Sequence, residues 1–211
     1  MLHLIVKGGW LMLPILICSI FSLAIIIERI FFFSSIKFDT HSIIPQILEF
    51  VRTGRTAEAV EVCDKKPFHV TNILKAGFLH YDESKEIVKE SMEDASLYEI
   101  PKLEKNLHFL STIAHIAPLI GLLGTVVGLV KCFYVIEQKT VNMMGVVNPA
   151  DLAGGIWEAL LTTVAGLCVA IPTYIAYNYF VQKVNLLVLE SERAATELLE
   201  VHSERRYACE V

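Results

Sequence analysis

Glu158 is the only charged residue in an apolar run that extends from Ile156 to Val181. A charged side chain inside a membrane-spanning helix costs on the order of a few kcal/mol. A carboxylate kept at such a cost normally faces a protein interior or a water-filled cavity, and it marks a functional site by default. Glu158 is therefore the first candidate functional residue of this chain.

Two other interpretations of Glu158 stay open on the sequence alone. It lies close to one end of its run, so its side chain could reach the lipid headgroups. It could also form an ion pair with Lys131, which lies near the end of another apolar run and could equally reach the membrane surface by itself.

Threonines within the apolar runs are the next candidates. Thr162 and Thr163 follow Glu158, and Thr125 lies in the run from Ile113 to Ile136. A threonine in a helix often donates its hydroxyl hydrogen to a carbonyl of its own helix, about four residues earlier. A purely structural role for these hydroxyls therefore stays as open as a functional one.

Helical winding sorts both runs into a small, polar face and a bulky, apolar face. The small faces carry Glu158, Ala159, Thr162, Thr163, Gly166, Ala170, Thr173 and Tyr177 on one helix, and Ala114, Ala117, Pro118, Gly121, Gly124, Thr125 and Gly128 on the other. Small residues let helices approach closely, and Pro118 and Pro172 are expected as tolerated kinks. Three helices of one chain can hardly enclose a polar lumen, so we expect several copies in a ring with these faces turned inward.

The elements that hold these residues follow from composition. Hydrophobic residues make up 54% of the 211 residues and charged residues only 19%, with a mean hydropathy of +0.53. Three runs, 10–27, 113–136 and 156–181, have the length of about 20 residues that a membrane-spanning helix needs. The sequence therefore predicts an all-α integral membrane protein with three transmembrane helices and long cytoplasmic helical extensions.

The distribution of Lys and Arg predicts an outside N-terminus and an inside C-terminus. The expected parts are an N-terminus outside the membrane with the first transmembrane helix (1–27), a cytoplasmic helical domain (28–110), the second transmembrane helix (111–136), a short loop on the outer side (137–155), the third transmembrane helix (156–181) and a cytoplasmic C-terminal helix (182–211). Within the cytoplasmic domain we expect short helices near 42–51, 57–63 and 70–80, a fourth capped by Ser84, and a bend at Pro101.

Several function classes find no support in the sequence. The net charge of −5 argues against a nucleic-acid partner. The five cysteines have neither metal-ligand nor redox spacing, and no nucleophile, phosphate-binding or zinc-protease motif is present. We therefore predict no enzyme, no cofactor and no metal site.

Two segments carry a specific resemblance. Residues 117–128, Ala-Pro-Leu-Ile-Gly-Leu-Leu-Gly-Thr-Val-Val-Gly, resemble the second-span signature of the MotA/TolQ/ExbB proton-channel family. Residues 155–167, Gly-Ile-Trp-Glu-Ala-Leu-Leu-Thr-Thr-Val-Ala-Gly-Leu, followed by Val-Ala-Ile-Pro at 169–172, resemble its third-span signature. The Glu28-Arg29 end of the first span fits as well, so the resemblance covers essentially the whole chain.

The resemblance implies a homopentamer in the bacterial inner membrane whose second and third spans line a central pore. The pore would hold the single transmembrane helices of an ExbD-like or TolR-like dimer, whose aspartate carries the protons. A TonB-like or TolA-like protein would pass the work to the outer membrane. By motif position, Thr125 and Thr163 would be pore hydroxyls near that aspartate, Thr162 would adjoin them, and Glu158 would be the pore carboxylate on the outer side.

The start of the third span, Glu158-Ala159-Leu160, resembles the ExbB/TolQ branch of the family, and the compact length and short N-terminus favour ExbB over TolQ. An ExbB-like stator subunit is therefore the leading hypothesis, and a TolQ-like subunit serving envelope integrity and cell division is the alternative. A scaffold that clusters partner proteins without conducting ions is a further one.

Overall fold

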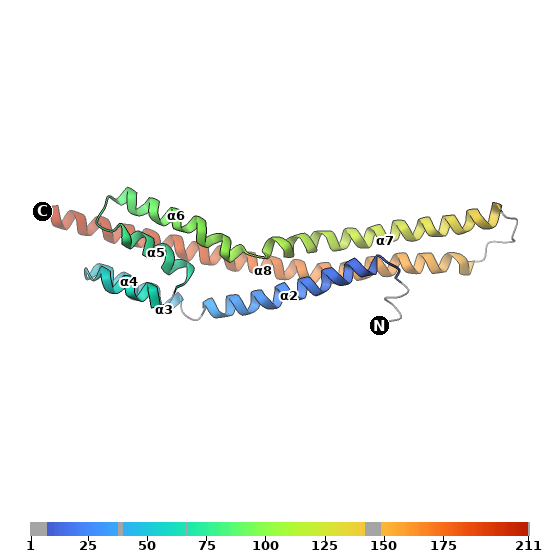
Figure 1. Cartoon of the computed structure of the whole chain (residues 1–211), viewed down its shortest axis with the longest axis horizontal. Coiled ribbons are helices and arrows are strands. Elements are labelled where there is room, and N and C mark those ends of the chain that lie inside the picture. Colours follow the sequence, from blue (N-terminus) through green and yellow to red (C-terminus); the bar gives the residue numbers. More distant parts are fainter. Residues whose placement is uncertain (1–7, 38–39, 66, 142–148, 211) are drawn as a thin grey trace. The chain divides into compact units, whose positions relative to one another are not determined.

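The computed structural model describes residues 8–37, 40–65, 67–141 and 149–210, and in these residues helices are joined by turns and short connections, without strands (Figure 1). The helices are α2 (Met12–Lys37), α3 (Thr40–Arg52), α4 (Thr56–Lys65), α5 (His69–Leu79), α6 (Lys85–Glu104), α7 (Leu107–Val141) and α8 (Pro149–Glu210). The predicted N-terminal part and outer loop lie outside the described residues at 1–7 and 142–148, whereas 137–141 and 149–155 are helical.

Three helices are long and apolar enough to cross a membrane, within Met12–Ser35, Leu107–Lys139 and Leu152–Glu204. Large apolar side chains on these helices are exposed in the single chain, among them Ile20, Phe133 and Ile175. Exposed apolar surface of this extent is expected where lipid or another subunit covers a helix. The chain is therefore an all-helical integral membrane protein.

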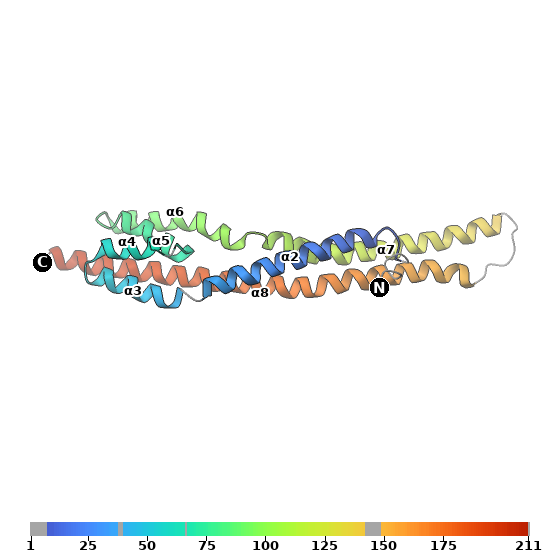
Figure 2. The same ribbon diagram turned by 60° about the horizontal axis from the view of Figure 1, so that its bottom comes forward.

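The chain divides into two compact units, residues 1–28 with 106–179 and residues 29–105 with 180–211. In the first unit, α7 and the first part of α8 lie side by side and run in opposite directions (Figures 1 and 2). Their contact is made of small residues, because Ala114, Ala117, Ala159 and Ala170 are all buried.

Glycines bring the backbones of α7 and α8 into direct contact. A Cβ atom on Gly166 would lie 2.6 Å from the carbonyl oxygen of Ala117, and one on Gly128 would lie 2.7 Å from that of Gly155. These distances are shorter than the van der Waals contact that any side chain needs. The two helices can therefore hold this spacing only with glycine at these positions.

The second unit has a conventional apolar core. Helices α3 to α6 and the end of α8 bury a continuous cluster in which Ile47, Leu74, Val88 and Leu198 are fully enclosed. Apolar residues at helical spacing, as in the segment from Ile43 to Val51, explain why short helices with polar outer faces form here.

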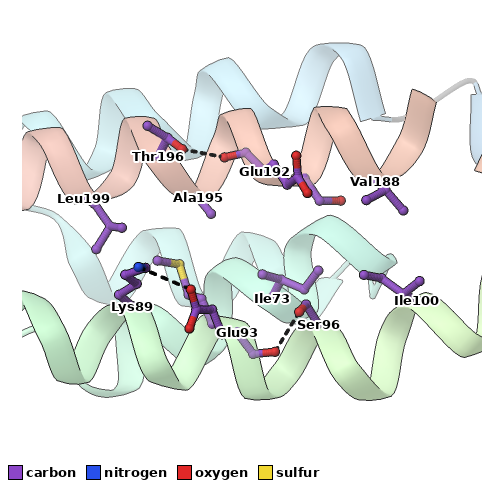
Figure 3. Close-up of a pocket in the computed structure, with 12 residues that line it drawn as sticks. Ile73, Lys89, Glu93, Ser96, Ile100, Val188, Glu192, Ala195, Thr196 and Leu199 are labelled. Atoms are coloured by element: carbon purple, nitrogen blue, oxygen red, sulfur yellow. Dashed lines mark hydrogen bonds and ion pairs between the residues drawn. The ribbon is translucent and has the colours of Figure 1, made fainter. Parts of the chain in front are cut away.

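A groove of about 340 Å³ lies between α6 and the last part of α8 in this unit (Figure 3). Lys89 and Glu93 form an ion pair at its edge, at 3.4 Å. The hydroxyls of its two serines, Ser96 and Ser191, donate to carbonyl oxygens of their own helices. The groove offers no grouping of side chains that could do chemistry, so the candidate site belongs to the first unit.

The bend expected at Pro101 stays a prediction. α6 includes Pro101 and continues to Glu104, and the chain leaves the helix at Lys105 and Asn106. Asn106 adopts a left-handed conformation with φ of 64°, which asparagine tolerates better than most residues. Its side-chain nitrogen donates to Glu28 Oε2 on α2, at 2.9 Å. A side-chain hydrogen bond, rather than a proline, thus accompanies the end of one helix and the start of the next.

Acid should destabilise the second unit through His69. Its side chain is buried, Nε2 has no hydrogen-bond partner among the described residues, and burial lowers its pKa from 6.5 to about 4, against a smaller opposite effect of Glu99. His69 therefore binds a proton near pH 6.5 in the unfolded chain but only near pH 4 in the folded chain. The contribution of neutral His69 to the free energy of unfolding is fully present above pH 6.5 and is lost as the pH falls from 6.5 to about 4.

We expect His69→Leu to reduce this loss, whereas replacing the exposed His108 with leucine should not. The measurement is the melting temperature of the detergent-solubilised chain at about pH 7.5 and about pH 5, on either side of the pKa of an ordinary histidine. An equal acid-induced decrease in the wild type and the His69 variant would contradict the assignment.

The α7–α8 contact predicts a sharp difference between two glycines. Gly128→Ala would place a methyl group against the Gly155 carbonyl and the side chain of Ala159, and we expect a loss of about 1–3 kcal/mol in unfolding free energy. Gly154→Ala, on α8, is the matched control because no atom lies within 4 Å of its added methyl. Thermal unfolding should show a lower melting temperature for the first variant alone; equal values would refute the contact.

Candidate functional site

Glu158 forms an ion pair with Lys131. Lys131 Nζ lies 2.5 Å from Glu158 Oε1, which joins α7 to α8. The carboxylate side chain is 20% exposed and the lysine side chain 48%, so the acid is the more enclosed partner. Of the interpretations that the sequence leaves open, the ion pair is the one that the geometry supports.

A glycine turn packs against this pair from the start of α2. A Cβ atom on Gly9 would collide with the Glu158 carboxylate, and Gly9 has a φ of +71° that favours glycine. Gly8, next to it, is buried near Met12 and Leu161. Sequence reasoning missed both glycines, although their position directly before an apolar run was the available signal.

Thr162 lies inside the helix contact. Its side chain is 1% exposed, and Oγ1 donates to the carbonyl oxygen of Ala159 on its own helix, at 2.8 Å. It occupies the space that a side chain at Gly124 would need. Thr162 therefore packs α8 against α7 in the single chain.

Thr163 and Thr125 are half-buried and use their hydroxyls differently. Thr163 Oγ1 donates across the contact to the carbonyl oxygen of Gly121 on α7, at 3.0 Å. Thr125 Oγ1 donates to the carbonyl oxygen of Leu122 on its own helix, at 2.6 Å. Each oxygen keeps lone pairs that can accept a further hydrogen bond.

The residues predicted for helix packing and the pore wall divide into two groups. Gly121, Gly124, Gly128, Gly166 and Ala170 are buried, and the glycines meet the facing helix. Pro118 is half-buried and Pro172 is exposed, and α7 and α8 continue through them. The pore wall itself stays a prediction.

His115 is a titratable residue that sequence reasoning passed over. Its ring makes an edge-to-face pair with Tyr174 of α8, with 6.2 Å between ring centroids and 87° between ring planes. Its Nδ1 lies 2.7 Å from the carbonyl oxygen of Ser111. The signal was available, since His115 is the only histidine in the three apolar runs.

In the part of the chain that the structure describes, no three His, Cys, Asp or Glu side chains are grouped so that they could hold a metal ion. The arrangement of the first unit is instead that of ionisable groups and hydroxyls distributed along two tightly packed helices.

The ion pair predicts non-additive effects on stability. Lys131→Met and Glu158→Met should each lower the melting temperature of the chain, because each leaves one charge without its partner. The double variant should recover a large part of the loss, because a neutral pair has no charge to solvate. Three melting temperatures against the wild type measure the coupling, and simple addition of the two losses would argue that the pair contributes nothing.

Comparisons with known proteins agree with this arrangement. A sequence profile of the MotA/TolQ/ExbB proton channel family matches residues 66–193. An ExbB-like biopolymer transport protein of Synechocystis is 29% identical over 173 residues, which are 82% of this chain and 81% of the relative. The biopolymer transport protein ExbB of Aquifex aeolicus is 41% identical over 101 residues, which are 48% of this chain and 65% of that protein.

A second branch of the family also matches. The Tol-Pal system protein TolQ of Pseudomonas aeruginosa is 35% identical over 133 residues, which are 56% of this chain and 54% of that protein. The profile match covers both the segment with Thr125 and the segment with Glu158 and Thr163. On these grounds the chain belongs to the MotA/TolQ/ExbB proton channel family, and it is ExbB-like.

Proposed function

We propose that this chain is the ExbB-like stator subunit of an inner-membrane motor that converts the proton motive force into mechanical work for energised outer-membrane transport. Several copies, five by resemblance to the family, would surround the transmembrane helices of an ExbD-like partner. A TonB-like protein would carry the work outward. The N-terminus would lie in the periplasm and the C-terminus in the cytoplasm.

The observation that carries the proposal is the position of Thr125 and Thr163 in the matched segments. Both are half-buried residues of α7 and α8, and their oxygens retain the capacity to accept a hydrogen bond. A hydroxyl that can rotate donates to a carboxylate and accepts from a carboxylic acid. Such a group suits both protonation states of an acidic side chain on a guest helix.

Glu158 also takes part in the proposed proton path, at its outer end. Its bond with Lys131 stabilises a charge close to the outer end of the third span, where a proton from the periplasm would enter. Thr162 contributes to helix packing, because its hydroxyl is buried and bonded to its own helix.

The energy that such a subunit would use is modest for each proton. One elementary charge that crosses a membrane releases about 2.3 kcal/mol per 100 mV. This amount suffices to break one or two hydrogen bonds between helices, so movement in small steps is expected.

A TolQ-like role is the second candidate, and the match to a TolQ protein supports it. The ExbB assignment rests on the longer coverage of the Synechocystis relative. Deletion of the gene separates them: an ExbB-like subunit gives a transport defect, and a TolQ-like subunit gives envelope and division defects. If the chain were a non-conducting scaffold, the process that it supports would not change when a protonophore is added.

Conservative replacement of the threonines tests the proposal. Thr163→Val and Thr125→Val should each strongly lower uptake that depends on the proton motive force, whereas Thr163→Ser and Thr125→Ser keep the hydroxyl and should retain most of it. Thr112→Val is the matched control, since Thr112 on α7 also donates to its own helix but lies close to the inner end of the apolar run. Wild-type uptake in both valine variants and in Glu158→Ala would refute the pore assignment.

A further inference from the structure

The apolar runs 10–27, 113–136 and 156–181 contain only three acidic, basic or histidine residues, His115, Lys131 and Glu158. Lys131 and Glu158 pair with each other, so their charges are balanced within the chain. His115 is the remaining one, and its contact is an uncharged aromatic ring, that of Tyr174. An ionisable residue within a membrane span is expensive and normally serves a function.

The hydrogen bond of His115 fixes the position of its ring proton. A carbonyl oxygen can only accept, so the contact between Nδ1 and the Ser111 carbonyl requires that Nδ1 carry the hydrogen. In the neutral ring, Nε2 then holds the lone pair that can accept a proton. The edge-to-face pair with Tyr174 restricts the rotation of the ring.

Helix geometry places His115 far from the ion pair along the membrane normal. Lys131 lies 16 residues after His115 on α7, and Tyr174 lies 16 residues after Glu158 on α8. At about 1.5 Å per residue, either helix separates the two pairs by about 24 Å. This length fits within a hydrocarbon core of about 30 Å. The two pairs therefore lie near opposite edges of one membrane.

Tyr174 shares a flank of α8 with Thr163. Tyr174 lies 11 residues after Thr163, which corresponds to about three helical turns. The imidazole beside Tyr174 thus lies on the inner side of the half-buried hydroxyl that the proposed function assigns to the proton path. An imidazole that can bind and release a proton is the kind of group that such a path needs at its inner end.

We infer that His115, positioned by Tyr174, is the proton acceptor at the inner end of the path; this inference rests on the proposed function. The carboxylic acid of the guest helix releases its proton to water on the inner side of the threonine hydroxyls, Nε2 takes a proton from that water, and the ring becomes an imidazolium ion. Nδ1–H stays bonded to Ser111. Nε2 then gives its proton to water at the inner face, and the neutral ring returns.

The test uses the complex purified from native membranes with its partner and placed in liposomes. Proton entry under an imposed potassium diffusion potential is followed with a pH-sensitive dye. His115→Asn keeps a donor for the Ser111 carbonyl but has no basic nitrogen, and we expect proton flux to fall by about tenfold or more. Tyr174→Phe keeps the ring and should retain flux.

His108→Asn is the matched control. His108 is an exposed histidine of the same helix with its own aromatic neighbour, Phe109, at 6.4 Å, but it lies outside the apolar run. Its replacement should leave flux unchanged. Diethyl pyrocarbonate, which modifies neutral imidazole, should inhibit the wild type and the His108 variant but not further inhibit His115→Asn.

Wild-type flux in His115→Asn, in a complex where Thr163→Val reduces flux, would overturn the inference and leave the proposed function standing. A wild-type complex without proton flux would overturn both. If the His115→Asn complex does not assemble, the wild-type complex is treated with diethyl pyrocarbonate, and mass spectrometry measures how much His115 is modified. Full proton flux in a complex whose His115 is modified would reject the inference.

Discussion

The close approach of α7 and α8 is the constraint on which the rest of the first unit depends. Lipid tails are as apolar as leucine, so the hydrophobic effect does little to hold two membrane helices together. Attraction must come from dense packing and from hydrogen bonds between helices. Glycines at 121, 124, 128 and 166 permit that packing, and the bond from Thr163 to the Gly121 carbonyl adds a polar link. The glycine contacts leave little freedom for one helix to slide along the other.

This fixed register has consequences at both ends of the helix pair. It brings Lys131 beside Glu158 at one end and His115 beside Tyr174 at the other. The first pair is charged and self-compensating, and the glycine turn at Gly8 and Gly9 packs against it. The second pair is an edge-to-face ring contact between two exposed residues. One chain thus presents two chemically different proton-binding groups at two depths, with the threonine hydroxyls between them.

The sequence contains enough to predict the three membrane-spanning helices, because uninterrupted apolar runs of this length are rare in proteins that do not cross a membrane. The ion pair is only one of several possibilities on sequence grounds, since a helical wheel shows which residues share a face but not how two helices are aligned. From the sequence, the hydroxyl of Thr163 could bond to its own helix or face a pore. Its hydrogen bond to the carbonyl oxygen of Gly121 depends on how α7 and α8 are aligned.

Other features depend on local geometry that the sequence does not specify. Pro101 lies exposed within α6, and the helix break after Glu104 coincides with the left-handed backbone of Asn106. No propensity scale predicts that conformation with certainty for an asparagine. His115 is easily overlooked because it has no second histidine at ligand spacing, a criterion suited to metal sites rather than to proton transfer.

The bond between Asn106 and Glu28 has a consequence for biogenesis. Glu28 leaves the ribosome long before Asn106, so α2 is available when the later segment is synthesised. The start of α7 can then be defined as that helix emerges, before α8 exists. Without the hydrogen bond between Asn106 and Glu28, the start of α7 would be fixed only later, when the glycine contact with α8 forms.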